Sequence, residues 1–109
     1  MAGVLVILPA GVAPPPLPEG VEVRPCATSG EVAAALRQAG GDVVLCVDGL
    51  PDAEVIAGAV RTVEAAVILV EPDAWDGETH SPVSAACSGV IAGFGIAGVS
   101  AAVALLLDA

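Results

Sequence analysis

The sequence predicts one α/β domain built on a flavodoxin-like parallel sheet of five strands, with helices on both faces. Short apolar runs rich in β-branched residues recur along the 109 residues, as expected of strands buried on both faces. Segments with the apolar spacing of a helix alternate with these runs, which is typical of a parallel sheet. The length suits a single domain, so residues 1–109 are expected to fold as one unit.

The order of the expected elements follows from apolar patterning and from the residues that end each run. Strands are expected at residues 3–8, 21–24, 42–47, 66–70 and 89–93, and helices at residues 31–39, 52–64 and 96–107. Thr28 and Glu31 form a capping box at the start of the first helix, and Gly40-Gly41 ends it.

The connection between the first two strands departs from this pattern. Residues 9–20 contain five prolines, so they predict an extended loop where a crossover helix is expected. One patch of the sheet would then lack its cover. Because exposed apolar sheet is rarely left in water, a partner subunit could supply the missing cover.

Charge and composition restrict the partners. With 13 acidic and 3 basic residues, the chain has a net charge of −10, which repels nucleic acid, anionic membranes and strongly anionic substrates. Three cysteines without a CxxC spacing, and no basic segment before Val4, indicate a reduced cytoplasmic protein. The chain has no Tyr, and Trp75 and Phe94 are its only aromatic residues.

The stretch from residue 81 to 107 has no charged residue. Its length alone would suit a membrane span. Pro82, several glycines and the lack of flanking Lys or Arg argue against one, so a buried strand, a turn and a core helix are expected instead.

Gly93, Gly95 and Gly98 match a GxGxxG pattern inside this stretch. The pattern comes late in the chain, and no acidic ribose partner follows about 20 residues later, so a nucleotide cofactor is not expected. We interpret these glycines as residues that let the last helix pack closely on the sheet.

Acidic residues gather just after the third and fourth predicted strands. They are Asp48, Asp52, Glu71, Asp73 and Asp76. The carboxyl ends of parallel strands form the ligand crevice of an open sheet. Three interpretations stay open: helix caps and solvated loop residues, a general acid created by mutual repulsion of carboxylates, or oxygen ligands for a hard cation. The first is favoured, and no metal is expected.

Two further residues in or near this loop are each the only one of their type in the chain. Trp75 is either a loop anchor or a flat wall for a ligand. His80 is the only histidine, and without a recognisable nucleophile motif it is more readily a structural hydrogen-bonding residue than a catalytic one.

From His80 the sequence reads H-S-P-V-S-A-A-C-S-G-V-I-A-G-F-G-I-A-G-V. This run resembles the C-terminal signature of the type II dehydroquinases (3-dehydroquinate dehydratases). Three upstream segments resemble strands of that family: residues 21–25, 43–52 and 67–73. The resemblance covers most of the chain and implies a flavodoxin-like fold, with trimers that assemble into dodecamers.

The resemblance also implies that the family's chemistry is lost. The family abstracts a proton with an Arg and a Tyr on a lid after the first strand, where this chain has its proline-rich loop. The family's substrate-holding Asn falls on Cys46, and its two site histidines fall on Asp52 and Glu71. The Ser that binds the substrate carboxylate falls on Asp73, and only His80 is retained. Active dehydroquinase chemistry is therefore not expected.

The sequence thus predicts a repurposed biosynthetic enzyme for a neutral, largely apolar small molecule. The expected reaction is a cyclisation or isomerisation, including pericyclic ones, because a shaped cavity alone can accelerate these without a cofactor. Glu71 and Asp73 are the candidate catalytic residues. The candidate substrate-binding residues are Leu8, Pro9, Cys46, Val47, Leu50, Asp52, Pro72, Trp75 and His80. The alternative is a non-catalytic pseudoenzyme or structural oligomer.

Overall fold

The computed structural model describes residues 3–47, 51–71 and 82–108. The strands are β1 (Val4–Pro9), β2 (Val21–Cys26), β3 (Val43–Leu45), β4 (Val67–Glu71) and β5 (Gly89–Ala92). The helices are α1 (Ser29–Gln38), α2 (Ala53–Val60), α3 (Pro82–Ala86) and α4 (Ala97–Asp108). All the strand pairings are parallel, in the order β2-β1-β3-β4-β5, which confirms the predicted flavodoxin-like fold.

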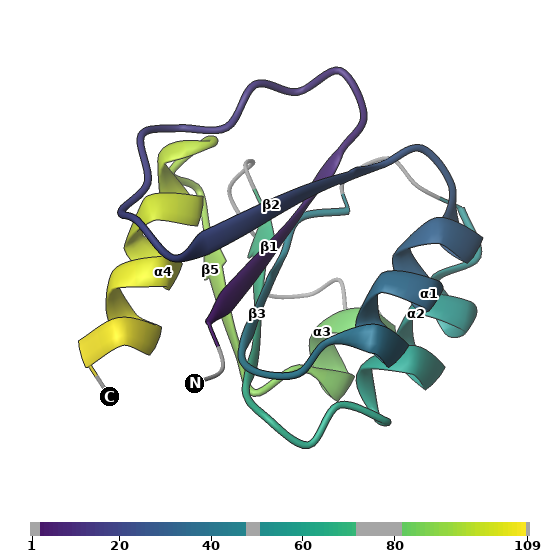
Figure 1. Cartoon of the computed structure of the whole chain (residues 1–109). Coiled ribbons are helices and arrows are strands. Elements are labelled where there is room, and N and C mark those ends of the chain that lie inside the picture. The colour runs from purple at the N-terminus through teal and green to yellow at the C-terminus, as the bar shows by residue number, and fades with distance from the viewer. Residues whose placement is uncertain (1–2, 48–50, 72–81, 109) are drawn as a thin grey trace.

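Side chains of β1 alternate between two cores on opposite faces of the sheet. Leu5 and Ile7 belong to the cluster under α1, α2 and α3. Val4, Val6 and Leu8 belong to the cluster under α4. Figure 1 shows the same division, with α4 alone on one side of the sheet and the other three helices together on the opposite side. A strand covered on both faces has to be apolar at every position, and this produces the uninterrupted run in the sequence.

Helix α1 begins as the capping box predicts. The Thr28 hydroxyl oxygen accepts a hydrogen bond from the Glu31 backbone N–H at 3.1 Å. The Glu31 carboxylate accepts a bond from the backbone N–H of Ala27 at 3.3 Å, one residue before the cap. The Thr28 hydroxyl therefore satisfies an N–H group of the first helical turn, and the Glu31 carboxylate holds the residue that precedes the cap.

Helices α2 and α3 differ from the expectation. Helix α2 ends at Val60, four residues before the predicted end, because the Thr62 and Val63 N–H groups bond the carbonyls of Ala59 and Val60 and tighten the chain into a turn. Helix α3 was not predicted. It has only 5 residues, starting with a proline at its first position, and that is too short for a helical period to be read.

The proline-rich connection from residue 10 to 20 forms no helix, as predicted. In Figure 1 it arches above β1 and passes close to α4 before β2 begins. Leu17 packs on the core cluster under α4, and the Ser100 hydroxyl donates a hydrogen bond to the Pro16 carbonyl at 3.3 Å. The loop thus covers part of the sheet near α4, and from the sequence a partner subunit could also supply such cover.

Glycines before α4 and in its first turn allow a tight turn and close packing on the sheet. Gly93 and Gly95 have positive φ angles of 85° and 58°, which side chains rarely adopt. A Cβ on Gly98 would lie 2.9 Å from Val70 Cγ1, so only glycine lets α4 approach β4 this closely. These contacts support the packing interpretation of the GxGxxG pattern. Within the part of the chain that the structure describes, no helix has the length and hydropathy needed to cross a membrane.

Candidate functional site

The carboxyl ends of the central strands meet at one edge of the sheet. Leu45 of β3 pairs with Ile7 of β1 and with Leu69 of β4. One more backbone hydrogen bond joins the two chain segments just beyond β3, from the Cys46 N–H to the Ile7 carbonyl of β1 at 2.9 Å. This register places the last residues of β1, β3 and β4 side by side, so this edge is the predicted ligand crevice.

Two of the candidate substrate-binding residues lie in the core beneath this edge. Leu8 and Cys46 are each 1 % exposed, and both belong to the cluster under α4. Their side chains can form only the floor of a site, not its open walls. Pro9 and Val47 are half-buried, and Val47 packs on the opposite core, on the side of α1, α2 and α3.

Glu71 is the last residue of β4, and its side chain is half-buried. Its backbone carbonyl accepts a hydrogen bond from the Gly93 N–H at 3.1 Å, which holds it beside the end of β5. Leu45 and Leu69 both face the side of the sheet covered by α1, α2 and α3. Val47 lies two residues after Leu45, and Glu71 lies two residues after Leu69. Because side chains alternate along a strand, the Glu71 carboxylate and Val47 lie on the same side of this edge.

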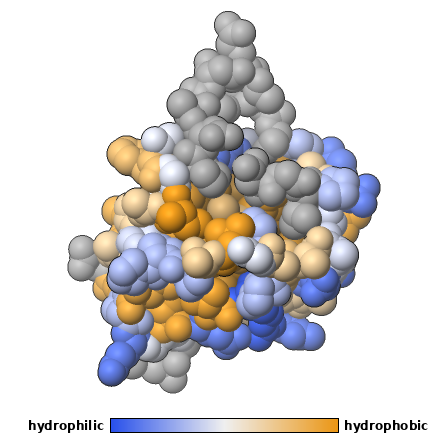
Figure 2. All heavy atoms as spheres, turned by 90° about the horizontal axis from the view of Figure 1, so that it is seen from above, coloured by the Kyte–Doolittle hydropathy of each residue, from blue (hydrophilic) through white to orange (hydrophobic). Residues whose placement is uncertain are grey.

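Figure 2 looks down on this edge from above. Among the described residues, hydrophobic side chains gather in the middle of the surface, and hydrophilic ones lie mainly around its rim. A carboxylate among apolar groups can bind and orient one polar group of a ligand, while the rest of the ligand contacts apolar surface.

Asp52 stands at the start of α2, as predicted, but its side chain makes no capping hydrogen bond and is exposed. Its backbone adopts a left-handed conformation with a φ of 59°, which is uncommon outside glycine and is best tolerated by Asp and Asn. The preceding Pro51 carbonyl accepts a hydrogen bond from Ser29 at the start of α1. Ser29 is the one buried polar residue among those described, and the sequence analysis did not single it out.

The remaining predicted site residues lie outside the described residues. They are Leu50, Pro72, Asp73, Trp75 and His80. Asp48 and Asp76 of the acidic group are outside as well. Their predicted roles stay predictions. Residues 3–47, 51–71 and 82–108 contain no group of three or more His, Cys, Asp or Glu that could hold a metal ion.

The thiols of Cys26 and Cys87 are not activated. Burial raises the pKa of Cys87 to about 11. Burial, together with the Glu31 carboxylate, also raises the pKa of Cys26, and Arg24 only partly opposes this. Since the thiolate is the nucleophile, these two groups are poor nucleophiles near neutral pH.

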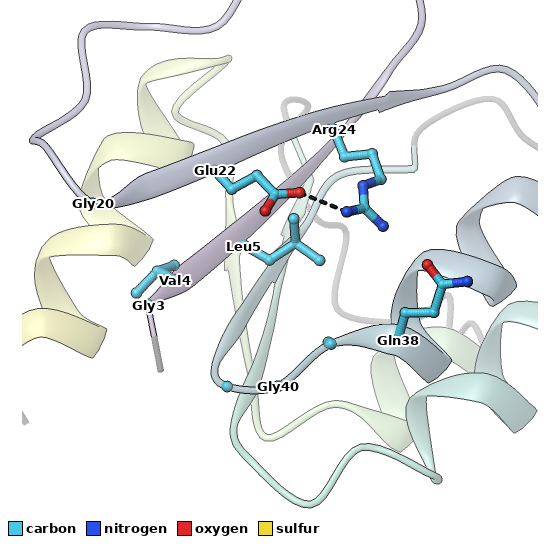
Figure 3. Close-up of a pocket in the computed structure, with 10 residues that line it drawn as sticks. Gly3, Val4, Leu5, Gly20, Glu22, Arg24, Gln38 and Gly40 are labelled. Atoms are coloured by element: carbon cyan, nitrogen blue, oxygen red, sulfur yellow. Dashed lines mark hydrogen bonds and ion pairs between the residues drawn. The ribbon is translucent and has the colours of Figure 1, made fainter. Parts of the chain in front are cut away.

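A hollow of about 270 Å³ lies at the opposite edge of the sheet, where the strands begin. Figure 3 shows Glu22 and Arg24 of β2 on one side of it and Gln38 at the end of α1 on the other. The Glu22 carboxylate and the Arg24 guanidinium are 2.6 Å apart and largely exposed, so each charge already has its partner. Much of the lining is glycine backbone, which leaves no pattern in the sequence to predict such a hollow.

Comparison with solved structures identifies the fold. The whole chain is similar to all of a chain described as type II dehydroquinase from Propionibacterium acnes, with a TM-score of 0.73 and 22 % sequence identity. No protein-family model matches the sequence, and no curated protein is similar to it. At this identity the similarity shows a dehydroquinase-like fold, as the sequence resemblance implied.

Proposed function

We propose that this protein is an enzyme of small-molecule biosynthesis that cyclises or isomerises a neutral, largely apolar substrate at the carboxyl edge of its sheet. The observation that carries the proposal is Glu71. It is half-buried at the end of a central strand, on the same side as Val47, at an edge whose middle is apolar. The dehydroquinase-like fold supports a ligand site at this edge.

The proposed chemistry needs only an apolar binding surface and a carboxyl group. An apolar surface that holds a flexible substrate in one reactive conformer lowers the entropic part of the barrier. The Glu71 carboxyl group can hydrogen-bond a polar group of the substrate, or move a proton between two of its atoms. Both reactions rearrange bonds within one molecule, so no oxidant, reductant or second substrate is required. Asp73 is the predicted second carboxylate.

Charge supports the choice of substrate. The net charge of −10 raises the cost of bringing an anion to any face of the protein. We therefore propose that 3-dehydroquinate, a carboxylate, is not turned over. The free thiols of Cys26 and Cys87 support a reducing, cytoplasmic setting for the proposed activity.

Turnover tests the proposal directly. Purified protein is incubated with uncharged polyenes and polyketide-like chains, and products of unchanged mass are separated by chromatography. Glu71→Gln is expected to lower the rate by at least about 100-fold, as loss of a general acid or base does. Glu54→Gln, at an exposed position in the first turn of α2, is the matched control and should keep the full rate. No product above background from any substrate would contradict the proposal.

A second candidate function is that of a non-catalytic binding or structural protein. The observation that favours it is the burial of Leu8 and Cys46, whose side chains fill space beneath the edge instead of lining a cavity. Fluorescent probes separate the two candidates. Saturable binding of neutral Nile red without turnover of any substrate favours the non-catalytic function, and turnover excludes it. The anionic dye ANS should bind far more weakly than Nile red if charge selects the ligand.

A further inference from the structure

The hollow at the edge where the strands begin lies on the side of the sheet that α1 covers. Glu22 of β2 is opposite Leu5 of β1, and Leu5 belongs to the core under α1, α2 and α3. Arg24 follows Glu22 by two residues, so its side chain is on the same face of the strand. Helix α1 ends at Gln38, and the hollow of about 270 Å³ is bounded by this helix end and by the two strands (Figure 3).

Arg24 differs from the other basic residues of the chain. There are three such residues, and the structure describes them all. Arg37 and Arg61 are exposed, whereas Arg24 is partly buried and lines the hollow. In Figure 3 its guanidinium lies between the Glu22 carboxylate and the Gln38 amide. The hollow therefore presents a positive and a negative group side by side.

The ion pair leaves both of these groups able to bind a further partner. Their hydrogen bond joins Nη2 of Arg24 to Oε2 of Glu22. The guanidinium has other N–H donors, and the carboxylate has a second acceptor oxygen. The Gln38 amide adds a donor and an acceptor, and the end of α1 adds backbone carbonyls with partial negative charge. Beneath these polar groups, Leu5 supplies an apolar floor.

We propose that this hollow binds a small α-amino acid with an apolar side chain. The two charged groups of an α-amino acid are joined through one carbon atom, so they are as closely spaced as those of Glu22 and Arg24, which are 2.6 Å apart. The carboxylate of the ligand binds the guanidinium, and its ammonium group binds Glu22. The apolar side chain of the ligand contacts Leu5.

Charge and size favour this class of ligand. An anion at Arg24 would be repelled by Glu22 and by the net charge of −10, and a cation at Glu22 would be repelled by Arg24. A zwitterion has no net charge, and each of its charged groups meets the opposite charge. Sites for drug-sized ligands have roughly 300–1,000 Å³, so a hollow of about 270 Å³ suits a smaller molecule. This inference does not depend on the function proposed for the carboxyl edge.

Amide NMR titration of the full chain with L-valine tests the proposal. L-valine is expected to bind with a Kd of about 1 mM, because contacts between exposed charges are weak. The shifted amides should include Gly20, Gly40 and Gly41, which line the hollow. Isovalerate lacks the ammonium group and isobutylamine lacks the carboxylate, so each should bind at least about 10-fold more weakly than L-valine. Equal binding of the three probes, or no binding of L-valine, would overturn the proposal.

Variants locate the site independently. Arg24→Gln and Glu22→Gln each remove one charged partner of the ligand, so each should weaken L-valine binding by about 10-fold. Arg37→Gln is the matched control, because it makes the same change of charge in the last turn of α1 at an exposed residue outside the hollow, and it should keep the wild-type affinity. Equal affinities of the Arg24→Gln and Arg37→Gln proteins would overturn the assignment. Shifts at Val47 and Glu71 without shifts at the three glycines would do the same, since the amino acid would then bind at the carboxyl edge.

Discussion

Both faces of the sheet cover a buried core, but the outward surfaces of their helices differ. Leu36 of α1 and Val103 of α4 are each 1 % exposed, so the cores on the two sides exclude water to the same extent. Outside these cores the surfaces diverge, since α1 and α2 present charged residues to solvent and α4 presents Ala and Leu. The quality of a core therefore does not reveal the role of the helix that covers it. That role depends on the helix's outward side.

The faces also differ in how they are covered. Three helices cover one face, while a single helix and the proline-rich loop cover the other (Figure 1). A single helix has to lie very close to the sheet to bury it, and the contact of Gly98 with Val70 shows this closeness. The two sides should therefore respond differently to added and removed side-chain volume.

The largest expected effect comes from adding volume under α4. Gly98→Val places methyl groups where a Cβ alone would lie 2.9 Å from Val70 Cγ1, so it should lower the free energy of unfolding by about 3 kcal/mol. Gly58→Val in α2 is the control, because no atom lies within 4 Å of its Cβ position, and it should change stability little. Urea denaturation of both variants measures the difference. Equal losses would show that α4 is not packed more tightly than α2.

A smaller loss of stability should follow from truncating Leu17, the residue of the proline-rich loop that packs on the core under α4. Leu17 is half-buried on the core under α4, so Leu17→Ala should cost about 1.5 kcal/mol, less than the truncation of a fully buried leucine. Val12→Ala, in the same loop at 41 % exposure, is the control and should cost far less. If both variants denature alike, the loop does not cover the sheet and the two faces differ even more than described.

The smallest effect is a pH dependence on the three-helix side, where Cys87 packs on the core. Burial raises its pKa from an ordinary value of 9.0 to about 11, so the folded state favours the neutral thiol. Stability from this group is complete below pH 9 and is lost as the pH rises towards 11. The chain has no Lys and no Tyr, so the side chains that titrate in this range are thiols, and Cys26, whose pKa is also raised, contributes in the same direction. Cys87→Ala should flatten the dependence of the melting temperature on pH between 9 and 11, and an unchanged slope would contradict this.

The parts of the fold that the sequence predicted are those with strong periodic or capping signals. Each predicted strand is present within a few residues of its expected position, and Thr28 caps α1 as its spacing to Glu31 indicated. The errors occur where local pattern is weak. Helix α3 is too short for a period, and the end of α2 depends on turn hydrogen bonds of Thr62 and Val63, which apolar spacing does not reveal.

The position of the candidate residues in the fold was predictable, whereas the burial of their side chains was not. Parallel strands have to end at a common edge, so Pro9, Val47 and Glu71 could be assigned to it from topology alone. Whether a side chain at that edge faces a ligand or the core depends on strand alternation and on the helix beneath. For this reason Leu8 and Cys46 are buried, and the sequence did not predict their burial.

Among the residues that the structure describes, β2 lies at one edge of the sheet and no strand pairs with its outer backbone. An exposed edge of this kind is a template on which other chains can add strands and aggregate. Pro25 removes one N–H from this strand, and Glu22 and Arg24 place opposite charges along it. These residues make it less favourable for a strand of another chain to pair with this edge. Replacing all three with β-branched apolar residues would be expected to turn a well-behaved acidic protein into one prone to fibril formation.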